Sequence, residues 1–275
     1  VSCGKEELDR VTETYRRIRN TMRFLLGAVN DFDFKRDQVE YSQMTEIDQW
    51  ALHELFELTE KVTKAYDTYE FYKVYHLLNN FFTVDLSATY LDVLKDRLYT
   101  WKADGTPRRA AQTVLYTITD YVIRMMSPIL SFLAEEVYSH VKGEKAESVF
   151  LLDFPKAPAQ WNQPELMKKF EGLLRVRSDV QKILEPLRTQ KVIGASLEAA
   201  VTITAEGDLH KDLQAFKDLR EFLIVSKVEV KSGPFAVNAE KAPGEKCVRC
   251  WVYSTEISLE AKTLGVCPKC VEALS

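Results

Sequence analysis

No stretch of this 275-residue chain approaches the roughly 18 consecutive apolar residues that a helix needs to cross a bilayer. The N-terminal residues also lack the basic-then-apolar pattern of a secretory signal, so we expect a cytoplasmic protein without a membrane partner. An excess of positive charge is missing too, because the net charge is −4. This balance argues against a protein that coats DNA, whereas a local basic patch could still bind RNA phosphates.

Glycine and proline are absent between Tyr41 and Tyr99, and apolar residues in this stretch recur at helical spacing. Thr45 and Asp48, near its start, have the spacing of a capping box, a pair of reciprocal hydrogen bonds that closes a helix N-terminus. This long uninterrupted stretch predicts helices that pack on one another rather than a sheet.

A break in the helical pattern follows at residues 102–107. Pro107 suits the first turn of a helix, which we predict over residues 108–141. Pro128 inside that range predicts a kink or a restart of the helix. Residues 1–147 are therefore predicted to form a helical bundle of four or five long helices.

The character of the sequence changes after this bundle. Residues 148–163 are rich in proline and poor in helical periodicity, which predicts a connector. Residues 164–244 are predicted to form a helix with a small α+β unit, and residues 245–275 a separate tail. Within this part we expect a helix over 164–189 whose regular part ends at Pro186, a strand over 197–204, a helix over 209–222, and strands over 224–230 and 235–237.

Four of the five cysteines form two pairs in the tail. Cys247 and Cys250 are separated by two residues, as are Cys267 and Cys270, and sixteen residues lie between the pairs. Each turn places two thiolates at the spacing that tetrahedral zinc requires, with Zn–S distances of about 2.3 Å. Four thiolates leave no open coordination position, so we expect one structural Zn²⁺; two redox-active or disulfide pairs are the alternative interpretation. The remaining Cys3 is expected to be an unpaired thiol.

The fold class predicted from these elements is mainly α: a helical bundle, then a small α+β unit and a C-terminal four-cysteine zinc ribbon. Trp251 directly follows the first cysteine pair, and Arg249 lies within it. An aromatic ring beside a basic residue can stack on an unpaired base and neutralise a phosphate. Alternatively, Trp251 packs over the sulfurs and shields them from water.

A basic helix near the N-terminus provides the second candidate site. On a helical wheel Arg16, Asn20 and Arg23 lie along one stripe, with Arg19 at its edge; we call these four residues the arginine face. Arginine suits phosphate because its planar fork makes paired hydrogen bonds. A solvated face, or pairing with carboxylates of neighbouring helices, is the alternative. We predict RNA contacts from the arginine face and from Arg17. The opposite side carries Ile18, Met22, Leu25 and Val29.

The string YRRIRNTMRFLL at residues 15–26 resembles the start of the anticodon-binding domain of class I isoleucyl-tRNA synthetases. The four-cysteine tail with its Trp resembles the zinc tail of the bacterial-type enzymes. These stretches occur in the order of the family and together span nearly the whole chain. Further similar stretches are residues 90–100, residues 126–132 with 135–137, and residues 193–199.

This resemblance implies the C-terminal fragment of an isoleucine–tRNA ligase that uses ATP and Mg²⁺ to charge tRNA and edits misacylated valine in another domain. Editing is needed because one methylene gives only roughly 1–3 kcal/mol of discrimination. The His-x-Gly-His and Lys-Met-Ser-Lys-Ser signatures are absent, as is any recognisable editing sequence. We therefore expect no catalytic residue here and no activity of this piece alone.

The resemblance also implies the partners. They are an isoleucine-accepting tRNA and the catalytic and editing domains of the same polypeptide, with the protein a monomer. A chain that opens on Val1 rather than Met is expected to be a piece of a longer protein. The alternatives are a free-standing zinc-ribbon RNA-binding module without ligase activity, and a structural zinc protein whose bundle binds other proteins.

Overall fold

The structure is a computed structural model that describes residues 4–143, 145–260 and 263–275. Cys3, predicted to be an unpaired thiol, lies outside the described residues. The chain is mainly helical, with a small sheet unit and a four-cysteine cluster near its C-terminus, which confirms the predicted fold class. None of the helices in the described ranges is long and apolar enough to span a membrane.

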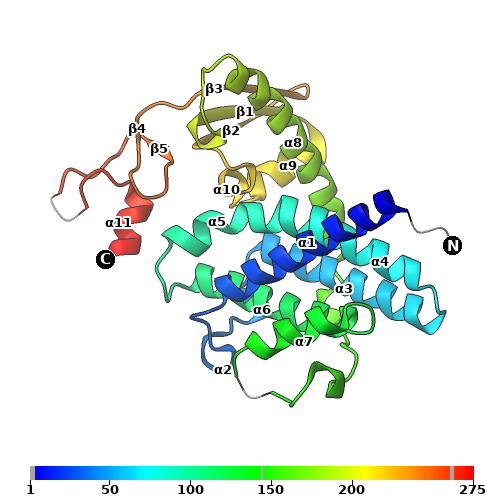
Figure 1. Cartoon of the computed structure of the whole chain (residues 1–275). Helices are drawn as coiled ribbons and strands as arrows, with labels where there is room; N and C mark the ends of the chain where they lie inside the picture. Colours follow the sequence, from blue (N-terminus) through cyan, green and yellow to red (C-terminus); the bar gives the residue numbers. More distant parts are fainter. Residues whose placement is uncertain (1–3, 144, 261–262) are drawn as a thin grey trace. The chain divides into compact units, whose positions relative to one another are not determined.

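Two compact units make up the chain, and they are not contiguous in sequence (Figure 1). The first unit comprises Val1–Leu94 and Thr106–Gln163, and the second comprises Lys95–Gly105 and Pro164–Ser275. The second unit therefore includes the end of a helix from the N-terminal half of the sequence. The divisions predicted after residues 147, 163 and 244 remain predictions.

The first unit is built on long helices that share one apolar core. Helix α1 (Lys5–Ala28) packs against α6 (Thr106–Met126) and α7 (Ser131–His140), and α3 (Glu46–Asp67) packs against α4 (Phe71–Asn80) and α6 (Figure 1). The predicted apolar side of α1 is buried, from Ile18 to Val29. Shorter elements are α2 (Phe34–Asp37), the 3₁₀ helices η1 (Tyr41–Gln43), η3 (Val149–Leu151) and η4 (Ala159–Trp161), and the π-helix η2 (Phe81–Tyr90).

Local sequence signals set the ends of these helices. The backbone N–H and the hydroxyl of Thr45 donate to Asp48 Oδ2 at 3.3 and 2.8 Å, so the predicted capping box opens α3. Pro107 lies in the first turn of α6, as predicted. The helix stops before Pro128 and restarts as α7, because proline cannot donate to the carbonyl one turn earlier.

The second unit holds a three-stranded sheet in the order β2-β1-β3. Strand β1 (Ala199–Ala205) pairs parallel with β2 (Lys227–Ser232) and antiparallel with β3 (Ala236–Lys241); Val201 faces Val228 across the parallel pair. The predicted β-α-β pattern and third strand are confirmed. Helix α5 (Leu91–Thr100) joins the two units along the chain. Other elements of the second unit are α8 (Pro164–Thr189), the 3₁₀ helix η5 (Ser196–Glu198), β4 (Glu245–Lys246), β5 (Tyr253–Ser254) and α11 (Pro268–Leu274).

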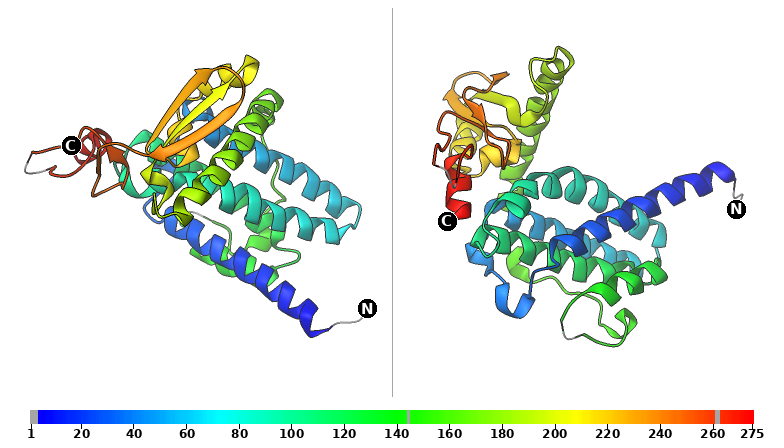
Figure 2. Two further views of the ribbon diagram at one scale, coloured as in Figure 1. Left: turned by 90° about the horizontal axis from the view of Figure 1, so that it is seen from above. Right: turned by 60° about the vertical axis from the view of Figure 1, so that its left-hand side comes forward.

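Two predictions for this unit are wrong. The connection between the parallel strands is two helices, α9 (Gly207–Ala215) and α10 (Leu219–Leu223), rather than one over residues 209–222. The chain turns at Phe216, whose ring packs edge-on against Phe170 and Phe222, so tertiary packing overrides the helical pattern. The predicted bounds of α8 are confirmed, but its regular part does not end at Pro186, because the helix continues past the proline to Thr189. Helices α8 and α9 lie against the sheet (Figure 2).

Two carboxyl groups lie close together where α3 meets η2 in the first unit. Burial, reinforced by the Asp85 carboxylate, raises the pKa of Glu54 from its ordinary value of 4.5 to about 7. Burial likewise raises the pKa of Asp85 from 3.8 to about 6. Between the ordinary pKa and the raised pKa of each group, the folded unit therefore holds protons that the unfolded chain has released. Its free energy of unfolding should fall as pH rises through this window.

Replacing Glu54 by Gln should remove much of this pH dependence. We expect the variant to gain about 1–3 kcal/mol over the native protein at pH 8, because it no longer ionises a buried carboxyl group. Urea unfolding of both proteins at pH 5 and pH 8 measures the effect. Glu60→Gln, which alters an exposed carboxylate of the same helix, is the control and should leave the pH dependence intact. Equal pH dependence of Glu54→Gln and the native protein would contradict the prediction.

Candidate metal centre and nucleic-acid interface

The four predicted cysteine ligands converge in the second unit. The sulfurs of Cys247, Cys250, Cys267 and Cys270 all lie within 4.8 Å of one another, and all four cysteines are buried and free of disulfides. The sulfurs of Cys250 and Cys267 are 3.6 Å apart. Two ligands of a tetrahedral site with Zn–S bonds of about 2.3 Å lie about 3.8 Å apart, so this donor set fits one metal ion.

Backbone groups and apolar side chains complete this centre. Although burial disfavours its thiolate, N–H donors at Cys250 and Cys267 lower the pKa of Cys247 to about 6. Burial raises the pKa of Cys250 to about 12, so four neighbouring thiolates require a compensating cation. Val252 and Val266 pack around the sulfurs, and Leu197, Ile257 and Val271 pack against this small core.

Basic residues within the two cysteine turns attach the tail to the end of α5. Lys269 forms an ion pair with Asp96, donates to Thr100 Oγ1 at 3.2 Å, and lies over the Trp101 ring. Arg249, predicted to contact RNA, donates from Nε to the Thr100 carbonyl at 3.2 Å. Residues 95–101 therefore form the platform on which the tail is held. The arginine lies at a helix C-terminus, where cations are favoured.

Trp251 is presented outward rather than over the sulfurs. It is 60% exposed, and its backbone has a φ of 67°, in the left-handed region. Lys246 Nζ lies 5.2 Å from the centroid of its ring, so a cation accompanies the aromatic surface. The packing alternative is therefore wrong, because the valines shield the sulfurs instead. An exposed indole beside a lysine is suited to stacking on an unpaired base.

The arginine face is exposed on α1, as its wheel position predicts. Arg16, Asn20 and Arg23 are exposed, and their side chains make no hydrogen bond or ion pair to any other residue that the structure describes. Arg19 Nη2 lies 3.2 Å from Glu136 Oε1 of α7, so one member takes the alternative of pairing with a neighbouring helix. Arg17 lies off this face and pairs with Glu13 on the same helix at 3.3 Å.

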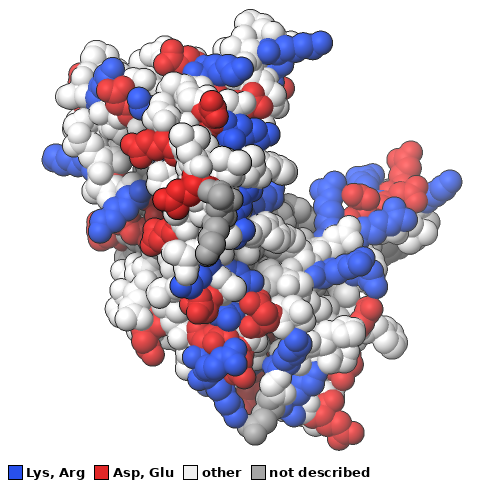
Figure 3. Space-filling view, turned by 90° about the vertical axis from the view of Figure 1, so that its left-hand side faces the viewer, with Lys and Arg blue, Asp and Glu red and all other residues white. Residues whose placement is uncertain are grey.

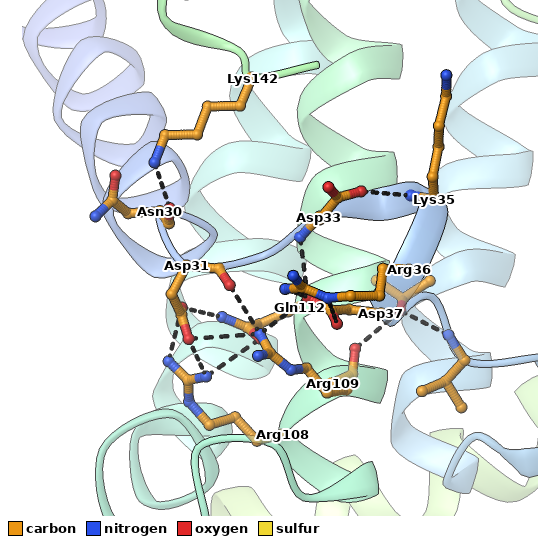
Figure 4. Close-up of polar contacts among 12 residues, drawn as sticks. Asn30, Asp31, Asp33, Lys35, Arg36, Asp37, Arg108, Arg109, Gln112 and Lys142 are labelled. Carbon is orange, nitrogen blue, oxygen red and sulfur yellow. Dashed lines mark hydrogen bonds and ion pairs between the residues drawn. The ribbon is translucent and has the colours of Figure 1, made fainter. Parts of the chain in front are cut away.

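A different set of arginines secures the loop after α1 (Figure 4). Arg108 donates to both oxygens of Asp31, at 2.7 and 3.0 Å, and Gln112 Nε2 donates to the same carboxylate at 2.8 Å. The Arg108 hydrogen bond is the main reason why the pKa of Asp31 falls to about 2. Arg109 bonds the Asp31 carbonyl at 3.1 Å and lies near Asp37. These arginines are committed to carboxylates and fix the end of α1.

Charge of both signs is mixed on one face of the molecule (Figure 3). On the face shown in Figure 3, Lys and Arg side chains alternate with Asp and Glu side chains without a broad area of one sign. Long-range attraction of a polyanion is therefore weak on this face. Binding of RNA would depend on local groups such as the arginine face and Trp251.

A pocket of about 220 Å³ opens beside the arginine face, between α1 and α7. Arg19 and Arg23 line it from α1, and Glu136 and His140 line it from α7. Sequence reasoning missed the two α7 residues. Both lie in a helix predicted from its periodicity, but no sequence signal places that helix against the arginines of α1.

Comparisons with known proteins agree with this arrangement. The family model described as "Anticodon-binding domain of tRNA ligase" matches residues 48–203, and the one described as "Zinc finger found in FPG and IleRS" matches residues 244–273. The first match begins after α1, so the arginine face is compared only through whole-chain relatives.

These relatives are ligases. Isoleucine–tRNA ligase of Geobacter sulfurreducens is 44% identical over 287 residues, covering 100% of this chain and 31% of that protein. The corresponding ligase of Carboxydothermus hydrogenoformans is 44% identical over 279 residues, covering 97% of this chain and 30% of that protein. The chain therefore spans less than a third of these relatives. With more than half of its residues matched by the anticodon-binding model, the chain belongs to the family of tRNA ligase anticodon-binding domains, and the relatives that match its whole length are isoleucine–tRNA ligases.

Proposed function

We propose that the chain recognises the anticodon arm of an isoleucine-accepting tRNA for an isoleucine–tRNA ligase. The observation that carries this proposal is the exposed set of Arg16, Asn20 and Arg23, whose side chains have no partner among the described residues, on a chain of the anticodon-binding family. Arg17, Arg19, Arg249 and Trp251 are the further proposed contacts. Single-stranded loops suit such a surface because their bases can be splayed out and stacked on aromatic rings.

Zinc belongs to the same proposal. Cys247, Cys250, Cys267 and Cys270 would hold one Zn²⁺, whose role is to fold the tail and present Trp251. Activation of isoleucine with ATP and Mg²⁺, and editing, would reside in other domains of a longer polypeptide. We expect the piece alone to be inactive, monomeric and cytoplasmic. A free-standing module is disfavoured because the relatives that match the whole chain are isoleucine–tRNA ligases and the zinc-finger model is one found in FPG and IleRS.

The proposal is tested by fluorescence anisotropy of the whole chain with isoleucine tRNA and with the same tRNA carrying a changed anticodon. We expect clearly weaker binding to the changed anticodon, because base edges in the loop would no longer meet their partners. Equal affinity for both RNAs would exclude anticodon recognition by this chain.

Replacing Arg16 and Arg23 together by Ala should weaken tRNA binding roughly 10-fold or more and reduce the slope of log affinity against log salt by about 1.5, since two phosphate contacts are lost. Titrations between 50 and 200 mM salt, roughly the range over which such slopes are resolved, measure both quantities. Arg175→Ala with Lys182→Ala removes the same charge from exposed positions of α8 and serves as the control. An unchanged slope in the first variant would remove the arginine face from the interface.

A further inference from the structure

The pocket between α1 and α7 is lined by both apolar and polar side chains. Leu26 of α1 with Leu133 and Val137 of α7 forms the apolar part of the lining, and Leu133 and Val137 are buried. Arg19 and Glu136 form an ion pair in the polar part, which also includes Arg23 and His140. At about 220 Å³ the pocket is smaller than the roughly 300–1,000 Å³ of sites for drug-sized ligands. It therefore suits a single flat ring system with a polar edge.

The Arg19–Glu136 pair sets a donor group beside an acceptor group in the pocket lining. Arg19 Nη2 lies 3.2 Å from Glu136 Oε1, and the two side chains are 47% and 50% exposed, so a ligand can reach both. A carboxylate accepts two hydrogen bonds in parallel, and a guanidinium only donates. The complementary ligand edge carries two adjacent N–H donors next to one acceptor.

Among the four RNA bases, guanine alone has this edge. Its N1–H and N2–H are adjacent donors, and its O6 acceptor lies beside them; arginine is a common partner of guanine O6. On the same edge, adenine has one donor, its N6 amino group, beside the acceptor N1. Uracil and cytosine each have two acceptors on this edge. A carboxylate facing any of these bases would lose one of its two hydrogen bonds.

The position of the pocket favours a base that is part of an RNA strand over a free base. Arg23 lines the pocket and is also a member of the arginine face, whose Arg16 and Asn20 continue along the same side of α1. A base in the pocket would place its flanking phosphates near these side chains. This geometry combines backbone binding with base recognition, the two components of specific RNA binding.

We propose that the α1–α7 pocket binds one unpaired guanine of an RNA loop, with Glu136 accepting from N1–H and N2–H and Arg19 donating to O6. The Arg19–Glu136 ion pair holds the two groups in this order before RNA arrives. The proposal rests on the proposed function, since it assigns one base of the same RNA to one pocket. It also assigns Glu136 a role that phosphate binding alone would not give to an acidic residue.

The test uses the whole chain and anticodon stem-loops of isoleucine tRNA in which each loop position is set in turn to guanosine, inosine or adenosine. At one position we expect adenosine to weaken binding about 5-fold to 100-fold, as for a lost bidentate base contact. Inosine lacks only the N2 amino group of guanosine, so the affinity for the inosine stem-loop should lie between those for guanosine and adenosine. Glu136→Gln should lose this preference at that position and keep its preferences elsewhere.

Glu13→Gln is the matched control, because Glu13 pairs with Arg17 on the same helix at 3.3 Å, with similar exposure, outside the pocket. Retention of the guanosine preference by Glu136→Gln would overturn the pocket proposal while leaving anticodon recognition in place. Binding by the native chain with no guanosine preference at any position would also overturn it. Failure of the native chain to bind any stem-loop would instead overturn the proposed function, on which the pocket assignment depends.

Discussion

Replacing Cys270 by Ser should abolish stoichiometric zinc binding and unfold residues 245–275, while the helical bundle of the first unit stays folded. Cys270 is fully buried, and its sulfur belongs to the four-sulfur cluster. Structural zinc contributes about 10–16 kcal/mol to the folding of small zinc peptides, whereas the tail has only a few apolar residues of its own. A three-cysteine site that lacks its fourth thiolate cannot hold the tail together.

Metal analysis and amide hydrogen exchange measure the two parts of this expectation. We expect about one equivalent of zinc in the native protein and far less in the variant, with fast exchange confined to the tail. Cys3→Ser makes the same substitution outside the zinc-finger match. This variant should keep both the metal and the slow hydrogen exchange of the tail. Full metal content in Cys270→Ser, or slow exchange in its tail, would show that the four-sulfur site does not maintain this fold.

Loss of the tail should also be visible at the α5 platform. Lys269 and Arg249 lie in the cysteine turns, and both bond groups at Asp96 and Thr100. Their placement depends on the metal, because the cysteine turns have little other support. Trp251 is presented from the same turn, so its proposed contact with RNA would be lost together with the metal. Metal removal should therefore weaken tRNA binding, even though the tRNA is not expected to contact the zinc ion.

The sequence predicts features that depend on local chemistry. Thr45 and Asp48 can form a capping box only at a helix start, and Pro128 must interrupt α6 wherever the bundle packs. The four cysteines identify their own site, because two Cys-x-x-Cys turns have few structural roles. The exposure of Arg16 and Arg23 follows from helical periodicity alone.

Features that depend on tertiary packing could not be predicted in the same way. The ten-residue π-helix η2 contains no proline or glycine, and its sequence is compatible with an ordinary helix. Phe216 ends α9 because a cluster of aromatic rings draws it inward. Glu136 becomes a neighbour of Arg19 across 117 positions of sequence. The grouping of residues 95–105 with the C-terminal unit depends on contacts of the same long range.

Arg97 is the clearest example of such a long-range contact, and its replacement by Met should destabilise the second unit by about 3–5 kcal/mol, the usual effect of breaking a buried ion pair. The side chain is almost fully buried: Nη2 lies 3.4 Å from Asp218 Oδ2, and Nε lies 3.8 Å from Glu221 Oε2. Burial already raises the pKa of Glu221, and Arg97 opposes that shift. Without the guanidinium, the Glu221 carboxylate would remain buried beside a neutral side chain.

The charge of Arg97 should also give the variant a pH dependence that a loss of packing alone would not produce. In Arg97→Met the pKa of Glu221 should rise further, so the folded state would bind a proton that the unfolded chain releases, and the variant should recover stability as pH falls. Adding Glu221→Gln should likewise restore part of the loss at pH 8. Urea unfolding followed by hydrogen exchange in residues 164–244 measures both effects, with Arg175→Met, an exposed arginine of the same unit, as the control. A loss that is independent of pH and unrelieved by Glu221→Gln would mean that Arg97 acts through its packing, and that its charge is not what joins α5 to α10.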